Sequence, residues 1–220
     1  MKSIERAPDL RRQVYERLRE SLRSGQLSAD MRLMEHGVAR DYGVSRTPAR
    51  EALAMLAQEG LLVQDGRGFR LPRYSEDEIR DVYEVRQTLE PVAVRRVLET
   101  ATAEQCAAVR ALIERELDEH GDHDSYIGAN ARIREAIFHL CPNEKLQQVV
   151  HLFEEMTQYI RLKTLTMPDV RALSVAGMRK LARAIGDRDA DAAEAAMNEL
   201  LTTARQEMLS VMADGPPPIP

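Results

Sequence analysis

The sequence predicts a mainly α protein in two parts, a small helical unit with a β-hairpin and then an all-α antiparallel bundle. Apolar residues recur every three or four positions through most of the 220 residues, which is the spacing of amphipathic helices. Two short apolar runs flank the turn "DGRG" at 65–68, a pattern typical of a hairpin. The charge is also uneven. Residues 1–74 carry 14 Lys+Arg against 10 Asp+Glu, whereas residues 75–220 carry 17 against 26.

Three helices are predicted in the first part. Residues 9–24 have apolar side chains at steps of four and are followed by Gly25, a residue that often ends a helix. A second, short helix is expected at 35–42. The third begins after Ser45, whose hydroxyl is expected to accept a hydrogen bond from an unpaired amide of the first turn, and it ends at Gly60.

The hairpin strands are expected at 61–64 and 68–72, after a short extended piece at 31–33. Three helices followed by a hairpin within about 65 residues is the arrangement of a winged helix-turn-helix, a DNA-binding module. The first domain is therefore predicted to span residues 1–74.

The second part, residues 75–213, reads as a bundle of six helices. Ser75 with Glu78, and Thr102 with Gln105, form two capping boxes that predict helix starts. Pro91 is expected to kink or break the first of these helices. The other helices are expected after Thr102 and at 125–140, 144–167, 170–185 and 190–212. The tail 214–220, "DGPPPIP", is expected to be disordered.

Several classes of protein are disfavoured by composition. No apolar run approaches the roughly 18 residues that a membrane-spanning helix needs, and the basic N-terminus lacks the apolar core of a secretory signal. Cys106 and Cys141 have neither metal-type nor disulfide-framework spacing. A cytoplasmic protein without membrane contact is therefore expected. The basic first part is expected to meet a polyanion.

The predicted third helix carries the main candidate contacts to double-stranded DNA. Arg46 and Arg50 are four residues apart and so share one helix face, where each could donate two hydrogen bonds to a guanine in the major groove. Ser45 and Thr47 could donate to phosphate oxygens, which sets the register. The alternative is that these arginines are simply a solvated face.

Two further contacts are expected outside this helix. His36, at the start of the second helix, is placed to touch the DNA backbone, although an exposed histidine often has no role. Arg67 lies between Gly66 and Gly68 at the hairpin tip and could enter the minor groove, because flanking glycines permit a close approach.

The stretch "GVSRTPAREALAMLAQEGLL" at 43–62 closely resembles the DNA-binding signature of the GntR family of bacterial transcription regulators. The second part resembles the helical effector domain (FCD domain) of the FadR subfamily, in its shorter, six-helix variant, through "EVRQTLEPVAVRR", "FHLCPNEKL" and "LARAIGDRDADAAEAAM". One departure is "SAD" at 28–30, where the family usually has a Pro-Gly turn. The resemblance implies a homodimer that binds a short palindrome, with repression relieved by a small metabolite, often a carboxylate.

The resemblance also raises the question of a metal. Many relatives hold a divalent ion with an acidic residue, a histidine four residues later, and two further histidines on the last two helices. Glu135 and His139 match the first pair, but the other two positions fall on Met178 and Leu200. A thioether and an aliphatic side chain cannot complete a site that needs three good ligands, so no metal cofactor is expected.

The candidate effector residues are Arg86, Glu135, His139 and Arg161. Arg86 could clamp a carboxylate or pair with Glu90 one turn away. Glu135 and His139 are expected either to form a polar wall of a metal-free pocket or to be a satisfied buried pair.

Two other functions remain as alternatives. The first is an all-α enzyme that uses Glu135 and His139 as acid and base. No nucleophile-base pair with an orienting third group supports it, so a non-enzyme is expected. The second is a DNA-binding dimer without a small-molecule effector.

Overall fold

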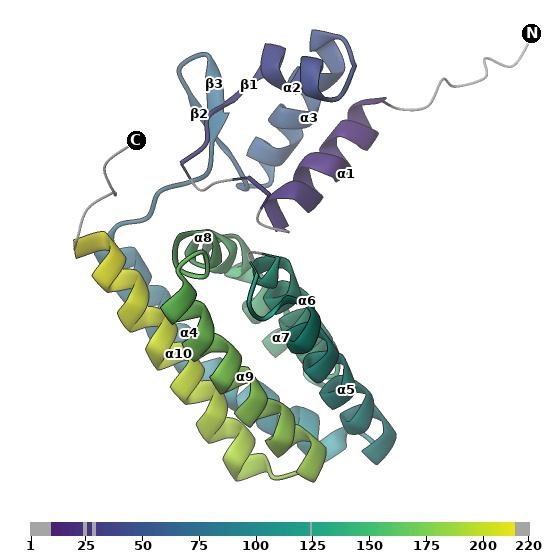
Figure 1. Cartoon of the computed structure of the whole chain (residues 1–220), viewed down its shortest axis with the longest axis vertical. Coiled ribbons are helices and arrows are strands. Elements are labelled where there is room, and N and C mark those ends of the chain that lie inside the picture. The colour runs from purple at the N-terminus through teal and green to yellow at the C-terminus, as the bar shows by residue number, and fades with distance from the viewer. Residues whose placement is uncertain (1–9, 24–25, 28–29, 124, 214–220) are drawn as a thin grey trace, which may run out of the picture. The chain divides into compact units, whose positions relative to one another are not determined.

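The computed structural model describes residues 10–23, 26–27, 30–123 and 125–213. The chain divides into two compact units, Met1–Arg73 and Tyr74–Pro220, and the described residues are largely helical, which confirms the predicted mainly α fold (Figure 1). The expected helix end at Gly25, the departure at Ser28 and the tail 214–220 lie outside the described residues.

The first unit contains three helices and a three-stranded sheet among its described residues. They are α1 (Leu10–Arg23), β1 (Leu33–Met34), α2 (Glu35–Asp41), α3 (Arg46–Gln58), β2 (Val63–Asp65) and β3 (Gly68–Arg70). The sheet has the order β1-β3-β2 and both pairings are antiparallel. The predicted helix-hairpin order is thus confirmed, and the short piece before α2 is a third strand of the same sheet.

Helices α1 and α3 pack on each other and form the core of this unit. Leu18 and Leu22 of α1 and Leu53 and Leu56 of α3 are 2% exposed or less. Gly60 follows α3 with φ of 79°, a left-handed conformation that glycine adopts without steric cost. The chain can therefore leave α3 and enter the hairpin.

The start of α3 differs in one detail from the sequence-based expectation. Ser45 occupies the N-cap position, but its side chain makes no capping hydrogen bond. The predicted hydroxyl cap is therefore wrong, and α3 is held by the burial of its apolar face.

The second unit contains seven helices within the described residues. They are α4 (Glu76–Thr100), α5 (Ala103–His120), α6 (Tyr126–His139), α7 (Glu144–Leu152), α8 (Glu154–Thr164), α9 (Pro168–Asp187) and α10 (Ala190–Ala213). The expected count of six is wrong, because the predicted helix 144–167 divides at Phe153. Leu152 is 72% exposed, whereas residues 156–162 are all buried.

Helix α4 runs through Pro91 and does not end there. An interior proline costs about 3 kcal/mol, but α4 packs along α10 for much of its length (Figure 1). Ile79, Tyr83, Val94 and Val97 of α4 are 2% exposed or less. This burial offsets the missing hydrogen bond, so the expected break does not occur.

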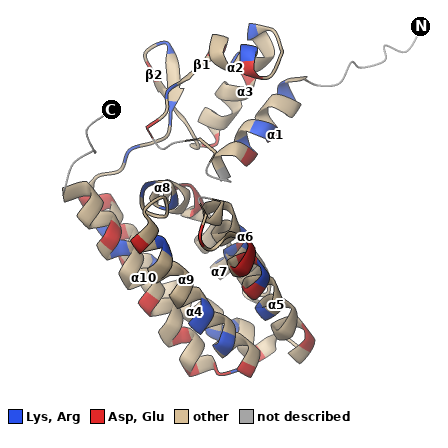
Figure 2. Ribbon diagram, viewed as in Figure 1, with Lys and Arg blue, Asp and Glu red and all other residues tan. Residues whose placement is uncertain are grey.

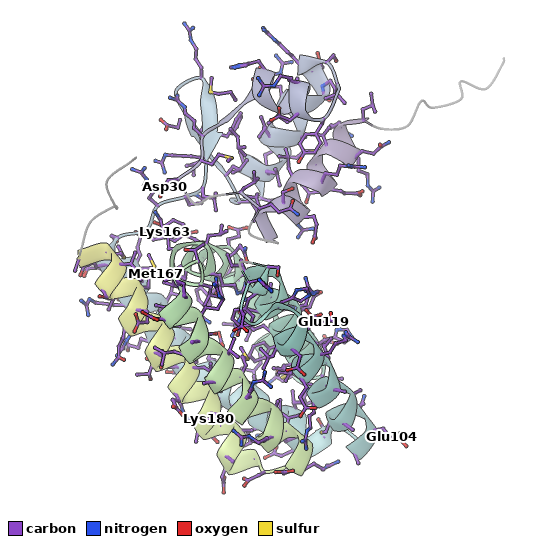
Figure 3. All side chains as sticks on the ribbon, in the orientation of Figure 1. Asp30, Glu104, Glu119, Lys163, Met167 and Lys180 are labelled. Carbon is purple, nitrogen blue, oxygen red and sulfur yellow. The ribbon has the colours of Figure 1, made fainter. Side chains whose placement is uncertain are left out.

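Both predicted capping boxes are present. The Ser75 hydroxyl accepts from the Glu78 amide, and the Glu78 carboxylate accepts from the Ser75 amide; Thr102 and Gln105 make the same pair of bonds. Side chains fill the space between the helices, and Lys163 and Met167 mark the end where α8 leads into α9 (Figure 3). None of the described helices combines the length and apolarity needed to cross a bilayer.

Candidate functional site

The first turn of α3 presents two arginines to solvent. Ala49 and Leu53 are fully buried and fix the rotation of the helix, which leaves Arg46 and Arg50 exposed on the other face. Neither guanidinium has a hydrogen bond or ion pair with another described residue. They are therefore available to an external acceptor.

Three other predicted contact residues are also exposed. Ser45 and Thr47 flank Arg46 at the start of α3, and His36 is the second residue of α2. The Ser45 hydroxyl makes no capping bond and so remains free to donate. Because the first four amides of a helix lack intrahelical partners, the start of α3 also offers backbone donors.

The hairpin tip has a defined geometry. Gly66 has φ of 58°, and a Cβ atom there would lie 2.9 Å from Nη2 of Arg32. That same nitrogen donates to the carbonyl of Asp65 at 2.6 Å, which links the residue before β1 to the turn. Arg67 is exposed at the tip, and basic segments lie on the hairpin and on the helices of this unit (Figure 2).

The second unit has a cavity of about 60 Å³ among α4, α6, α8, α9 and α10. Its polar lining comes from Tyr83, Arg86, Asn130, Arg134, Thr157, Arg161, Thr164 and Ser174. The rest of the lining is mainly apolar. Two of the four predicted effector residues, Arg86 and Arg161, therefore line the cavity.

Glu90 links two of these arginines. Its carboxylate accepts from Arg86 Nε at 2.7 Å and from Arg134 Nη1 and Nη2 at 2.9 and 3.0 Å. All three side chains are less than 10% exposed. Burial alone would raise the pKa of Glu90, but the charges of Arg134 and Arg86 outweigh it and hold that pKa at about 2.

Arg161 reaches the same cavity from α8. Its Nε donates to Asn130 Oδ1 at 2.9 Å, and its Nη1 donates to Glu154 at 2.6 Å and to Gln158 at 3.0 Å. Burial lowers the pKa of Arg161. The positive charges of Arg134 and Arg86 act in the same direction, whereas Glu154 opposes them.

Glu135 and His139 do not line the cavity. Both side chains are exposed on α6, so the expectation of a polar pocket wall or a buried pair at these residues does not hold in this chain. The inward pair with the same spacing of four is Asn130 and Arg134, which are 5% and 6% exposed. Sequence reasoning missed Arg134. Its spacing of four from Phe138, an apolar residue that is buried, could have placed it on the inward face of α6.

The lining does not suit a divalent cation. Met178 and Leu200, the two positions where the resemblance implies metal-binding histidines, both line the cavity. No group of three or more His, Cys, Asp or Glu side chains that could hold an ion occurs in the described part of the chain.

Comparisons with known families cover most of the chain. The family "Bacterial regulatory proteins, gntR family" matches residues 10–71, and the FCD domain matches residues 81–203. The HTH-type transcriptional regulator YdhC of Bacillus subtilis is 27% identical over 162 residues, 70% of each chain. The Escherichia coli regulator McbR is 32% identical over 130 residues, 58% of this chain and 59% of McbR.

Solved structures show the same fold. The structure titled "E. coli McbR/YncC" has a TM-score of 0.72 at 23% identity and covers 97% of this chain and 99% of its own. A GntR regulator from Rhodococcus sp. RHA1 has a TM-score of 0.73 at 18% identity, over 91% and 97% of the two chains. The chain therefore belongs to the GntR family of bacterial DNA-binding transcription regulators, in its FadR-like branch with a C-terminal FCD domain.

Proposed function

We propose that this protein is a homodimeric repressor that binds a short palindromic operator and responds to a small metabolite held in the cavity of the FCD domain. The first unit reads the operator and the second senses the ligand. Ligand binding at the cavity alters the affinity for DNA, which requires two dimer states with different affinities. The protein acts in the cytoplasm, where both operator and metabolite are found.

The observation that carries the DNA-binding half is the exposure of Arg46 and Arg50 at the start of α3. A recognition helix reads base edges with its N-terminal residues, and each bidentate arginine-guanine contact gives about 1–3 kcal/mol of discrimination. Ser45, Thr47 and His36 contact phosphates, and Arg67, beside Gly66, enters the adjacent minor groove.

The test is selection of binding sites from a random DNA library by the full chain at stated salt concentration. We expect a palindromic consensus whose half-sites are lost or relaxed with Arg50→Ala, because one base-reading guanidinium is removed. Arg17→Ala is the matched control: Arg17 is an exposed arginine of α1 in the same unit, and its replacement should leave the consensus unchanged.

Two outcomes contradict the proposal. One is enrichment of no sequence above salt-sensitive, non-specific binding. The other is an unchanged consensus with Arg50→Ala, which would mean that α3 does not present this arginine to base edges.

A further inference from the structure

The cavity of the FCD domain has a wall of hydrogen-bond donors. Arg86, Arg134, Arg161 and Tyr83 line it, and each is 6% exposed or less. They come from α4, α6 and α8. The apolar part of the lining comes mainly from Ile160, Leu165, Met178, Met197, Leu200 and Leu201.

Each of these four side chains has a buried polar atom without a hydrogen-bond partner among the described residues. The atoms are Tyr83 Oη, Arg86 Nη1, Arg134 Nε and Arg161 Nη2. Buried polar groups in folded proteins are nearly always paired, and guanidinium nitrogens can only donate. Three of the four unpaired atoms can therefore only donate, which favours a ligand that supplies oxygen atoms.

The charge balance at this wall is also incomplete. Three guanidinium groups are paired with two carboxylates, those of Glu90 and Glu154. Each guanidinium has a carboxylate partner, but Glu90 serves two of them, so the cluster keeps a net charge of +1, and an uncompensated buried charge is costly. A ligand with a single negative charge would balance it.

A divalent metal would not fit this wall. Its polar residues are three arginines, Tyr83, an amide and hydroxyls, and the lining contains no carboxylate, imidazole or thiolate. The inward pair on α6 is Asn130 and Arg134, an amide and a guanidinium that can only donate, whereas Glu135 and His139, the pair that the resemblance assigns to a metal, are exposed. The positive charges of the arginine side chains can attract an anion here without a metal ion.

We propose that the FCD domain binds a short-chain monocarboxylate directly, without a metal ion, through Arg86, Arg134, Arg161 and the Tyr83 hydroxyl. The carboxylate accepts from the unpaired donors, and its apolar substituent packs against the methionine and leucine side chains. This inference rests on the proposed function, because it names the chemical class of the effector.

The size of the cavity supports a compact ligand. The cavity is small, at about 60 Å³, so a carboxylate group with a short substituent fits it better than a large ligand does. Met178 and Met197 are adaptable side chains and can move to admit a slightly longer one.

The direct test is calorimetric titration of the full chain in EDTA with propionate and with propionamide. The two molecules have nearly the same shape, but only propionate carries a charge and two acceptor oxygens of equal strength. Acetate, butyrate and benzoate extend the series. We expect at least one carboxylate to bind, with its amide at least about 100-fold weaker, because charge-assisted hydrogen bonds are the strong ones.

Two matched tyrosine variants separate ligand contact from structural support. Tyr83→Phe removes a buried hydroxyl without a partner, so it should weaken the carboxylate about tenfold without lowering the melting temperature of the free protein. Tyr126→Phe makes the same change at an equally buried residue whose hydroxyl is paired with Ser174 at 3.0 Å and accepts from Asn130 Nδ2 at 3.4 Å. It should lower the melting temperature and leave the affinity within about threefold.

Four results would overturn the proposal. They are equal binding of a carboxylate and its amide, binding that EDTA abolishes and zinc or manganese restores, equal weakening by both tyrosine variants, and no binding by any carboxylate of the series. The titration contains no DNA, so its failure is distinct from that of the regulator assignment. If the DNA selection fails and propionate still binds, the proposed class of ligand is supported and the proposed operator binding is contradicted.

Discussion

At the scale of single residues, Glu90 is the acceptor that makes the arginine wall possible. It is 1% exposed and accepts from two guanidinium groups. Without its charge, Arg86 and Arg134 would be buried beside each other with no carboxylate between them. A removed partner that leaves an uncompensated buried charge costs about 3–5 kcal/mol.

Glu90→Gln should therefore lower the free energy of unfolding by about 3–5 kcal/mol, as measured by urea denaturation at neutral pH. Glu114→Gln is the control. Glu114 pairs with Arg110 at 2.8 Å, but both side chains are at least 40% exposed, and exposed pairs contribute about 0–1 kcal/mol. Equal losses in the two variants would contradict the role given to Glu90.

The same carboxylate should make stability depend on acid pH. The pKa of Glu90 in the folded protein is about 2, against an ordinary value of 4.5. Because the folded pKa is depressed, the stabilisation is complete above 4.5 and is lost as the pH falls from 4.5 towards 2. At about 1.4 kcal/mol for each pKa unit, the loss is about 3 kcal/mol.

Urea denaturation of the wild type and of Glu90→Gln at a series of pH values checks this prediction. The difference in unfolding free energy between the two proteins should shrink across that window, because glutamine cannot titrate. A difference that stays constant as the pH falls towards 2 would show that Glu90 is not the group that causes the loss of stability.

At the scale of elements, Ser75 and Ser45, which precede α4 and α3, make a natural comparison. Ser75 caps α4 through a capping box, whereas Ser45 precedes α3 without a capping bond. Ser75→Ala should cost about 1 kcal/mol of stability. Ser45→Ala should cost only a few tenths of that, since no hydrogen bond is lost.

The DNA affinity should respond in the opposite order. Ser45→Ala should weaken operator binding, because its free hydroxyl is proposed to contact a phosphate, and Ser75→Ala should leave the affinity unchanged. Thermal denaturation and fluorescence anisotropy with a labelled operator measure the two quantities. A larger stability loss for Ser45→Ala than for Ser75→Ala would contradict the observed caps.

The hairpin gives a second prediction at this scale. Gly68 pairs with Met34 across β1 and β3, and a Cβ atom there would lie 2.6 Å from Met34 Sδ and 2.9 Å from the carbonyl oxygen of Leu33. Gly68→Val should therefore destabilise the first unit by about 1–3 kcal/mol and weaken DNA binding, although Gly68 itself reads no base. Gly37→Val is the comparison for steric crowding, since nothing lies within 4 Å of its added Cβ.

At the scale of the whole molecule, the proposed dimer should require a fixed half-site spacing. A two-fold dimer reads half-sites about one helical turn apart. Insertion of five base pairs at the centre of the selected palindrome turns one half-site to the other face of the duplex. We expect the affinity in anisotropy titrations to fall at least about 100-fold. Unchanged binding to the lengthened site would exclude a rigid symmetric dimer. In a separate measurement, sedimentation should give twice the chain mass of 24.9 kDa.

Much of the architecture follows from local signals in the sequence. The spacing of apolar residues, the two capping boxes and the glycine-bounded hairpin turn identify most of the helices and the wing, because each signal acts over a few neighbouring residues. Arg46 and Arg50 could be placed on the exposed face of α3 for the same reason, since Ala49 and Leu53 fix the buried one.

The tertiary structure alone decided the rest. Helix α4 continues through Pro91 because α10 covers it, and the division at Phe153 interrupts an unbroken apolar pattern. The rotation of α6 turns Asn130 and Arg134 inward and leaves Glu135 and His139 exposed. Both pairs have the same spacing, so sequence could not choose between them. A buried Arg134 is stable only because Glu90, 44 residues earlier, meets it across the bundle, and such a long-range ion pair forms only when the helices pack.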